Sequence, residues 1–182
     1  MRLGKVQGLR RGASSIQITQ RKIIGKTQRD IKNQGKVFKN MKITICGSIK
    51  FAKEIIDVYD KVKSLGHEPV VHEQMKGLAE GTASQLVDKA NGMESSEIKK
   101  KYNYIKWWYG AIVNSDAILI CNFDKNGIKN YVGGNSLMEI GFAHVNDKKI
   151  FLLNPVPDGV PYVDEIKAMV DVVLEGDLTK IK

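Results

Sequence analysis

Two short apolar segments constrain the fold of this chain more than any other feature of its sequence. Residues 41–46 and 116–121 are almost continuously apolar, a pattern typical of strands buried on both faces of a parallel sheet. Helical periodicity follows the first segment, in the apolar residues that recur from Phe51 to Leu65. Strands that alternate with helices predict an α/β fold: an open, doubly wound, mostly parallel sheet with helices on both faces.

The other predicted elements are shorter. Further strands are expected at residues 67–72, 149–153 and 171–174. Pro69 indicates that the first of these is irregular or lies at an edge. Further helices are expected at residues 98–112, 136–145 and 163–169. Residues 74–96 are polar and glycine-rich around a helical piece at 83–90, and so long an insertion predicts a mobile lid or local disorder.

Positive charge is concentrated near the N-terminus. The net charge is +9, but residues 1–40 contain eleven Lys/Arg and one acid, which leaves 18 basic and 19 acidic residues in 41–182. Residues 1–40 lack a sustained period, so we expect a poorly ordered basic arm followed by one domain at 41–182. Such an arm is able to bind nucleic-acid phosphates. Aromatic residues do not alternate regularly with the charges, and this favours an arm without a specific partner.

Membrane insertion and secretion are not expected. The sequence has no run of about 18 apolar residues, and its first twenty residues lack the apolar core of a secretory signal. Its two cysteines, Cys46 and Cys121, have neither metal-binding nor redox spacing. We therefore expect a cytoplasmic protein with no metal and no cofactor.

The turn after the first strand has the composition of an anion site. In open α/β sheets, ligands bind at the carboxyl ends of the strands, where this turn must lie. Gly47, Ser48, Ile49 and Lys50 connect the strand to a helix, presenting backbone N–H groups, a hydroxyl and a positive charge. The competing interpretation is that Ser48 only caps the helix.

The segment that opens the helix at 136–145 is the most informative. Gly133 and Gly134 allow a backbone to approach a ligand closely, with Asn135 and Ser136 beside them. Glu139 falls one turn into the helix, where its carboxylate is able to face a bound molecule. However, Ser136 and Glu139 also have the spacing of a capping box, in which Glu139 would only satisfy backbone donors. The sequence leaves both interpretations open.

These motifs, in this order, resemble the nucleoside 2-deoxyribosyltransferase-like superfamily, which includes the 2′-deoxynucleoside 5′-phosphate N-hydrolases. The similarity covers roughly residues 41–155: the turn at 47–50, the strand at 116–121, and the stretch GGNSLMEIGFA that contains Glu139. It implies cleavage of an N-glycosidic bond or deoxyribosyl transfer on a nucleoside or nucleotide. The glutamate at position 139 would attack the anomeric carbon, and water or a second base would release the sugar.

The resemblance also implies roles for the surrounding residues. Ser48, Ile49 and Lys50 would hold a 5′-phosphate or 5′-hydroxyl, while Gly134 and Ser136 would line the same pocket. Members of the superfamily commonly self-associate, so a homo-oligomer is expected.

Two departures from the family pattern leave an alternative open. The family's usual aspartate is replaced within the run Trp107-Trp108-Tyr109, and Thr44 stands where the family has a tyrosine. Asp124 or Tyr131 is a candidate substitute. The alternative is a catalytically reduced domain that binds or senses a nucleotide.

Loop and aromatic residues complete the candidate set. Asn122, Asp124 and Tyr131 follow the second apolar strand and are expected near the ligand. Trp108, with Tyr104 four residues before it, has the spacing to stack on a base, although packing in the core or at a subunit interface is favoured.

Overall fold

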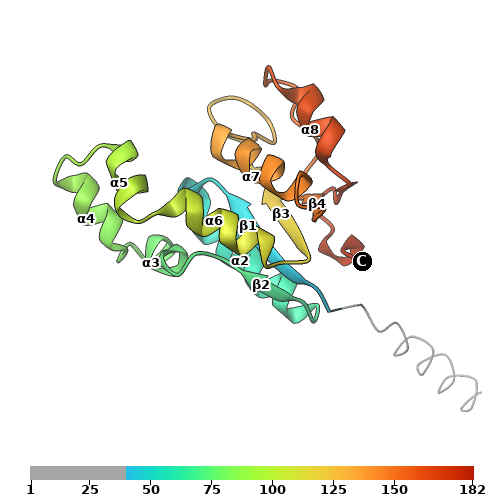
Figure 1. Ribbon diagram of the computed structural model, residues 1–182, viewed down its shortest axis with the longest axis horizontal. Coiled ribbons are helices and arrows are strands. Elements are labelled where there is room, and N and C mark those ends of the chain that lie inside the picture. Colours follow the sequence, from blue (N-terminus) through green and yellow to red (C-terminus); the bar gives the residue numbers. More distant parts are fainter. Residues whose placement is uncertain (1–39) are drawn as a thin grey trace, which may run out of the picture. The chain divides into compact units, whose positions relative to one another are not determined.

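Five parallel strands form one sheet, and their order determines where a ligand site is able to form (Figure 1). The computed structural model describes residues 40–182, so the arm expected at 1–40 lies outside the described residues apart from Asn40. In the order β2-β1-β3-β4-β5, the strands are Glu68–Val70, Lys42–Gly47, Ala117–Cys121, Lys149–Leu152 and Val172–Val173. Every adjacent pair is parallel, which confirms the predicted open α/β fold.

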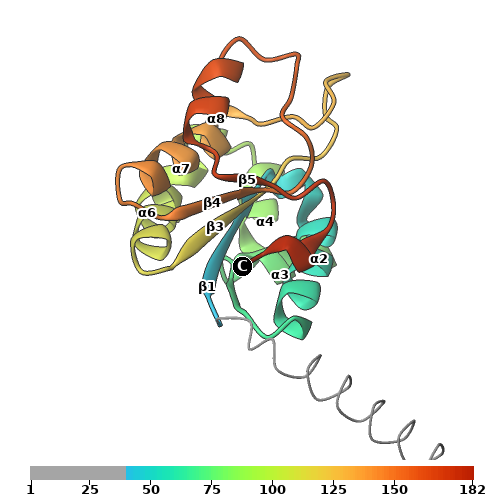
Figure 2. The same cartoon turned by 90° about the vertical axis from the view of Figure 1, so that its right-hand side faces the viewer.

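Helices cover both faces of this sheet (Figure 2). One layer contains α2 (Ala52–Ser64) and α3 (Gln74–Glu80); the other contains α6 (Tyr104–Val113), α7 (Gly134–His144) and α8 (Val163–Met169). Along β3, Ala117, Leu119 and Cys121 pack in the core on the α2 side, whereas Ile118 and Ile120 pack in the core beneath α6 and α7. All five residues of β3 are buried, which explains the uninterrupted apolar run in the sequence.

Gly66 and Pro69 explain two local features of the backbone between α2 and β2. Gly66 has a φ of 88°, a left-handed conformation that glycine adopts without strain, and it ends the turn after α2. Strand β2 is shorter than the predicted 67–72 and lies at the edge of the sheet. An edge strand pairs on one side only, so it tolerates Pro69, which has no N–H group to donate. Two 3₁₀ turns complete the described elements, η1 (Ile49–Phe51) and η2 (Leu178–Lys180).

The helical piece predicted at 83–90 is confirmed by α4 (Ser84–Ala90), whereas local disorder is not found, because α3 precedes it and α5 (Ser95–Lys101) follows it. The helix predicted at 98–112 is also divided, because Asn103 has a left-handed φ of 52° and separates α5 from α6. Asp88 joins α4 to the end of α5: it accepts hydrogen bonds from the Tyr102 hydroxyl at 2.7 Å and from Lys101 at 2.8 Å. The polar composition therefore belongs to the exposed surfaces of short helices.

Among the helices of residues 40–182, none combines the length and the apolar character needed to span a lipid bilayer.

Removing the Phe151 ring tests this description of the core. Phe151 on β4 is completely buried, so we expect Phe151→Ala to lower the free energy of unfolding by about 3–5 kcal/mol. Val145, after α7, is 74% exposed, and Val145→Ala is expected to change it by less than about 0.5 kcal/mol. Urea unfolding of both variants measures the difference, and equal effects would contradict the described core.

Candidate functional site

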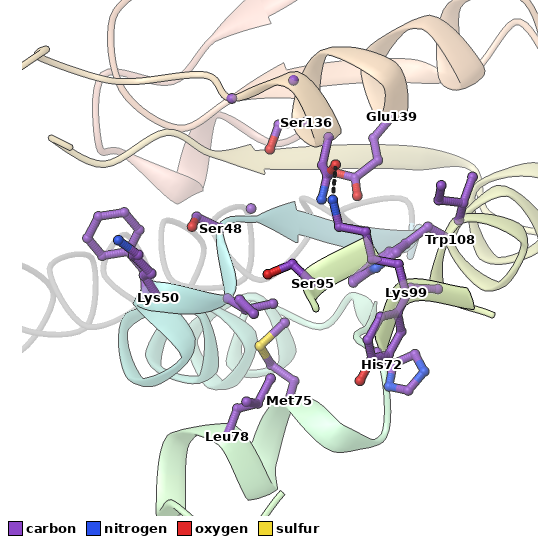
Figure 3. Close-up of a pocket in the computed structure, with 18 of the residues that line it drawn as sticks. Ser48, Lys50, His72, Met75, Leu78, Ser95, Lys99, Trp108, Ser136 and Glu139 are labelled. Carbon is purple, nitrogen blue, oxygen red and sulfur yellow. Dashed lines mark hydrogen bonds between the residues drawn. The ribbon is translucent and has the colours of Figure 1, made fainter. Parts of the chain in front are cut away.

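A cavity of about 600 Å³ lies at the carboxyl ends of β1 and β3 (Figure 3). Its walls come from the turn after β1, the start of α7, and the helices α3 to α6. This volume suits a small organic ligand. Eleven of the thirteen predicted site residues line it: Gly47, Ser48, Ile49, Lys50, Trp108, Tyr131, Gly133, Gly134, Asn135, Ser136 and Glu139.

Asn122 and Asp124 do not line the cavity but shape the loop after β3. The buried Asn122 side chain donates to the carbonyls of Asn130, Asn154 and Pro155 and accepts from the Asn154 N–H at 2.8 Å. The exposed Asp124 carboxylate accepts from the Asn130 N–H at 2.9 Å, and this bond holds the pKa of Asp124 below its ordinary value. Both side chains thus stabilise the conformation of the loop that brings Tyr131 to the cavity.

Gly47 allows the close approach between β1 and β3 at the cavity. A Cβ atom at this position would lie 3.0 Å from Ile55 Cδ1 and 3.2 Å from the Cys121 carbonyl oxygen. The backbone of the turn therefore reaches a place that no other residue type fits without displacement. Ser48 makes no capping hydrogen bond, so the capping interpretation of its hydroxyl is wrong.

Glu139 is buried in the cavity wall without a capping role. Gly133 is the N-cap residue of α7 and no side chain caps the helix, so Ser136 and Glu139 do not form a capping box. The Glu139 side chain is almost fully buried, yet its Oε2 atom has no hydrogen-bond partner. An unpartnered buried carboxyl oxygen is costly, and a ligand in the cavity is able to satisfy it.

Burial controls the charge of Glu139. It raises the pKa of the carboxyl from 4.5 to about 8, and a hydrogen bond with the Cys46 thiol opposes only part of this rise. Burial therefore favours the protonated carboxyl at neutral pH. A nearby positive charge or a suitable ligand favours its ionised form.

Lysines give the cavity a positive character. Lys50, Lys89, Lys99 and Lys125 line it, whereas Glu139 is the only acidic side chain among the described lining residues. Lys125 Nζ donates to the Ser48 hydroxyl at 2.9 Å, and both burial and the nearby Lys50 lower the pKa of Lys125. Ser48, Lys50 and Lys125 thus form a corner where an anionic group is favoured.

Sequence reasoning missed Lys125, although the signal was available. Lys125 follows β3, and β3 is paired with β1, so the loops after these two strands meet. It also missed Gln85 on α4, whose side chain is buried and whose Nε2 atom has no partner. The unpartnered atoms of Gln85 and Glu139 belong to residues that line the same cavity.

The aromatic residues divide between the cavity and the core. Trp108 lines the cavity and also packs against both cores. The Tyr104 hydroxyl donates to Gln74 Oε1 at 3.1 Å, and the Tyr104 ring lies against His72 at 4.8 Å between centroids. Thr44, at the position of the family's tyrosine, does not line the cavity; its hydroxyl is paired with that of Ser115 at 2.8 Å.

Within residues 40–182, no three His, Cys, Asp or Glu side chains gather closely enough to hold a metal ion. Comparisons with models of protein families, with curated proteins and with solved structures found no match to this chain.

The raised pKa of Glu139 makes a prediction about stability. The carboxyl ionises near 4.5 in the unfolded chain but near 8 in the folded protein, so ionisation costs folding stability as the pH rises between these values. We expect Glu139→Gln to remove this loss and to be more stable than the wild type by on the order of 3 kcal/mol at pH 8. Urea unfolding from pH 5 to 8 measures it. The exposed Glu165→Gln is the control, and equal pH slopes for wild type and Glu139→Gln would refute the prediction.

Gln85 offers a second test of an unpartnered group. Gln85→Met keeps the side-chain length but removes the buried N–H, so we expect a free energy of unfolding about 1 kcal/mol higher than in the wild type. Gln74→Met removes the acceptor of the Tyr104 hydroxyl and is expected to be destabilising by about 1 kcal/mol. Thermal unfolding compares the two variants; a destabilised Gln85→Met would show that this amide has a partner in the protein.

Proposed function

We propose that this protein cleaves the N-glycosidic bond of a nucleoside or nucleotide, or transfers its deoxyribosyl group, with Glu139 as the nucleophile. The observation that carries the proposal is the buried Glu139 carboxyl, whose unpartnered oxygen belongs to the same cavity as the Gly47–Lys50 turn. The resemblance of both motifs to the nucleoside 2-deoxyribosyltransferase-like superfamily supports it.

The chemistry requires a carboxylate at the anomeric carbon. One carboxylate oxygen of Glu139 forms a bond to C1′ while the bond from C1′ to the base nitrogen breaks, and the electron pair stays on the base. Water, or a second base, then attacks C1′ and releases the carboxylate. The transition state carries positive charge on the sugar, which an ionised carboxylate in a buried site stabilises.

The charges of the cavity suggest how a substrate lies. A 5′-phosphate would occupy the corner formed by Ser48, Lys50 and Lys125, where the backbone of the turn also offers N–H groups. The sugar would lie against Glu139, and the base would extend toward Trp108 and Gln85. A phosphate would thereby increase affinity, and a nucleotide is favoured over a nucleoside.

The runner-up function is a domain that binds or senses a nucleotide without turning it over. The raised pKa of Glu139 favours it, because a neutral carboxyl is a poor nucleophile. Two departures from the family pattern favour it too. Trp108 lies in the run that replaces the family's aspartate, and Thr44 stands at the position of the family's tyrosine.

Self-association and a cytoplasmic location stay predictions. The exposed Ile105 and Tyr109 on α6 are apolar surface of the kind that an interface between copies would cover.

Base release tests the proposed function. We expect the wild type to liberate free base from at least one of the four common 2′-deoxynucleoside 5′-monophosphates, measured by chromatography. Glu139→Ala is expected to lower kcat by at least about 1000-fold, because the covalent step is lost. Lys125→Met is expected to raise KM about tenfold for the monophosphate but not for the matching nucleoside.

The controls separate the two functions. Lys129 carries a charge in the same loop but does not line the cavity, so Lys129→Met should leave KM unchanged. Saturable nucleotide binding by calorimetry without any base release would support the sensing domain instead. Base release that persists in Glu139→Ala would remove Glu139 from the role of nucleophile.

A further inference from the structure

Lys99 extends from α5 to the helix that carries Glu139 (Figure 3). Its Nζ donates to Asn135 Oδ1 at 3.3 Å. The side chains of Lys99, Asn135 and Glu139 all line the cavity. Asn135 lies four residues before Glu139 in α7, so the two residues share one face of that helix. Lys99 therefore contacts α7 one helical turn before Glu139, whose carboxyl would attack the sugar.

The position of Lys99 is fixed by its own helix. The preceding residue, Ile98, is buried, and Tyr102 at the end of α5 is tied to Asp88 on α4 by a hydrogen bond of 2.7 Å. Glu94 and Glu97 form a capping box that fixes the first turn of α5. Lys99 thus reaches the cavity from an anchored helix rather than from a loop.

Three other ionisable groups in the cavity wall, those of Lys125, Tyr104 and His72, have hydrogen-bond partners elsewhere. Lys125 Nζ donates a hydrogen bond to the Ser48 hydroxyl, in the corner where an anionic group is favoured. The Tyr104 hydroxyl donates to Gln74 Oε1, and burial raises the pKa of Tyr104 to about 12. Burial lowers the pKa of His72, which favours its neutral form, and its Nδ1 accepts the backbone N–H of Gln74.

A departing nucleobase needs a proton, because the electron pair of the broken C1′–N bond otherwise leaves a full negative charge on the ring. Glu139 is unable to supply it while it acts as the nucleophile. We propose that Lys99, held by Asn135 beside Glu139, is the general acid that protonates the leaving base. This inference rests on the proposed function and assigns a second catalytic residue to the same site.

Protons and electron pairs balance over the two successive steps of the reaction. As a Glu139 oxygen bonds to C1′, the C1′–N bond breaks and the Lys99 ammonium transfers one proton to the base nitrogen. Lys99 is left as a neutral amine. When water attacks C1′, its proton passes to that amine, the bond from C1′ to Glu139 breaks, and both residues return to their starting states.

The dependence on the leaving group tests this role. The first substrate is whichever of the four common 2′-deoxynucleoside 5′-monophosphates the wild type cleaves fastest. The second is 7-methyl-2′-deoxyguanosine 5′-monophosphate, whose base carries a positive charge and departs neutral without a proton. We expect Lys99→Met to lower kcat about 100-fold or more on the first substrate. On the second, after subtraction of the uncatalysed rate, the expected decrease is less than about threefold.

Two further variants make the result specific. Lys99→Arg keeps the charge and a donor for Asn135, but a guanidinium does not release its proton, so we expect it to be as slow as Lys99→Met on the first substrate. Lys100→Met, an exposed neighbour on α5 that does not line the cavity, should match the wild type on both.

Three outcomes would overturn the assignment while leaving the proposed function in place. Equal slowing of both substrates by Lys99→Met would give Lys99 a binding or structural role, and an unchanged rate on the first substrate would give it no role. Full activity of Lys99→Arg would assign it charge stabilisation rather than proton transfer. If the wild type releases base from neither substrate, the proposed function itself fails, and the acid role fails with it.

Discussion

The close approach of β1 and β3 is the constraint on which the site depends. Gly47 pairs in register with Cys121, and a Cβ atom there would meet the Cys121 carbonyl oxygen and the Ile55 side chain. Because these strands run parallel and end together, the turn after β1 and the loop after β3 meet at one edge. The start of α7 reaches the same edge, so Glu139 lines the same cavity as Ser48, Lys50 and Lys125. A wider separation of the strands would leave these groups without a shared cavity.

The site is maintained at the expense of stability. Glu139 and Gln85 each keep a buried polar atom without a partner, although apolar clusters are buried on both faces of the sheet. A fold under selection for stability alone would replace such groups with apolar side chains. Their placement around one cavity, together with lysines that outnumber acids in its wall, is the signature expected of a binding or catalytic site.

The sequence was sufficient where local patterns decide the structure. Apolar runs predict the buried strands β1 and β3, and glycines predict the turn at Gly47 and the start of α7. Between residues 74 and 103 the sequence predicts only one separate helix, the piece that forms α4, because α3 and α5 have too few turns to show a clear period and Asn103 interrupts a continuous stripe. Gln85 and Lys99 belong to that stretch. Their relation to Glu139 depends on tertiary packing, which no spacing in the chain encodes. Asn122 was expected at the ligand for its place after β3, but its amide satisfies backbone groups instead.

The buried amide of Asn122 has a mechanical consequence. It bonds to the backbone on both sides of the β3 and β4 ends, at Asn130 within one loop and at Asn154 and Pro155 within the next. The two loops are thereby clamped through a single side chain, and neither is free to shift without straining the other. A molecule that displaces Tyr131 at the cavity would therefore also displace the connection that leads into α8, more than twenty residues farther along the chain.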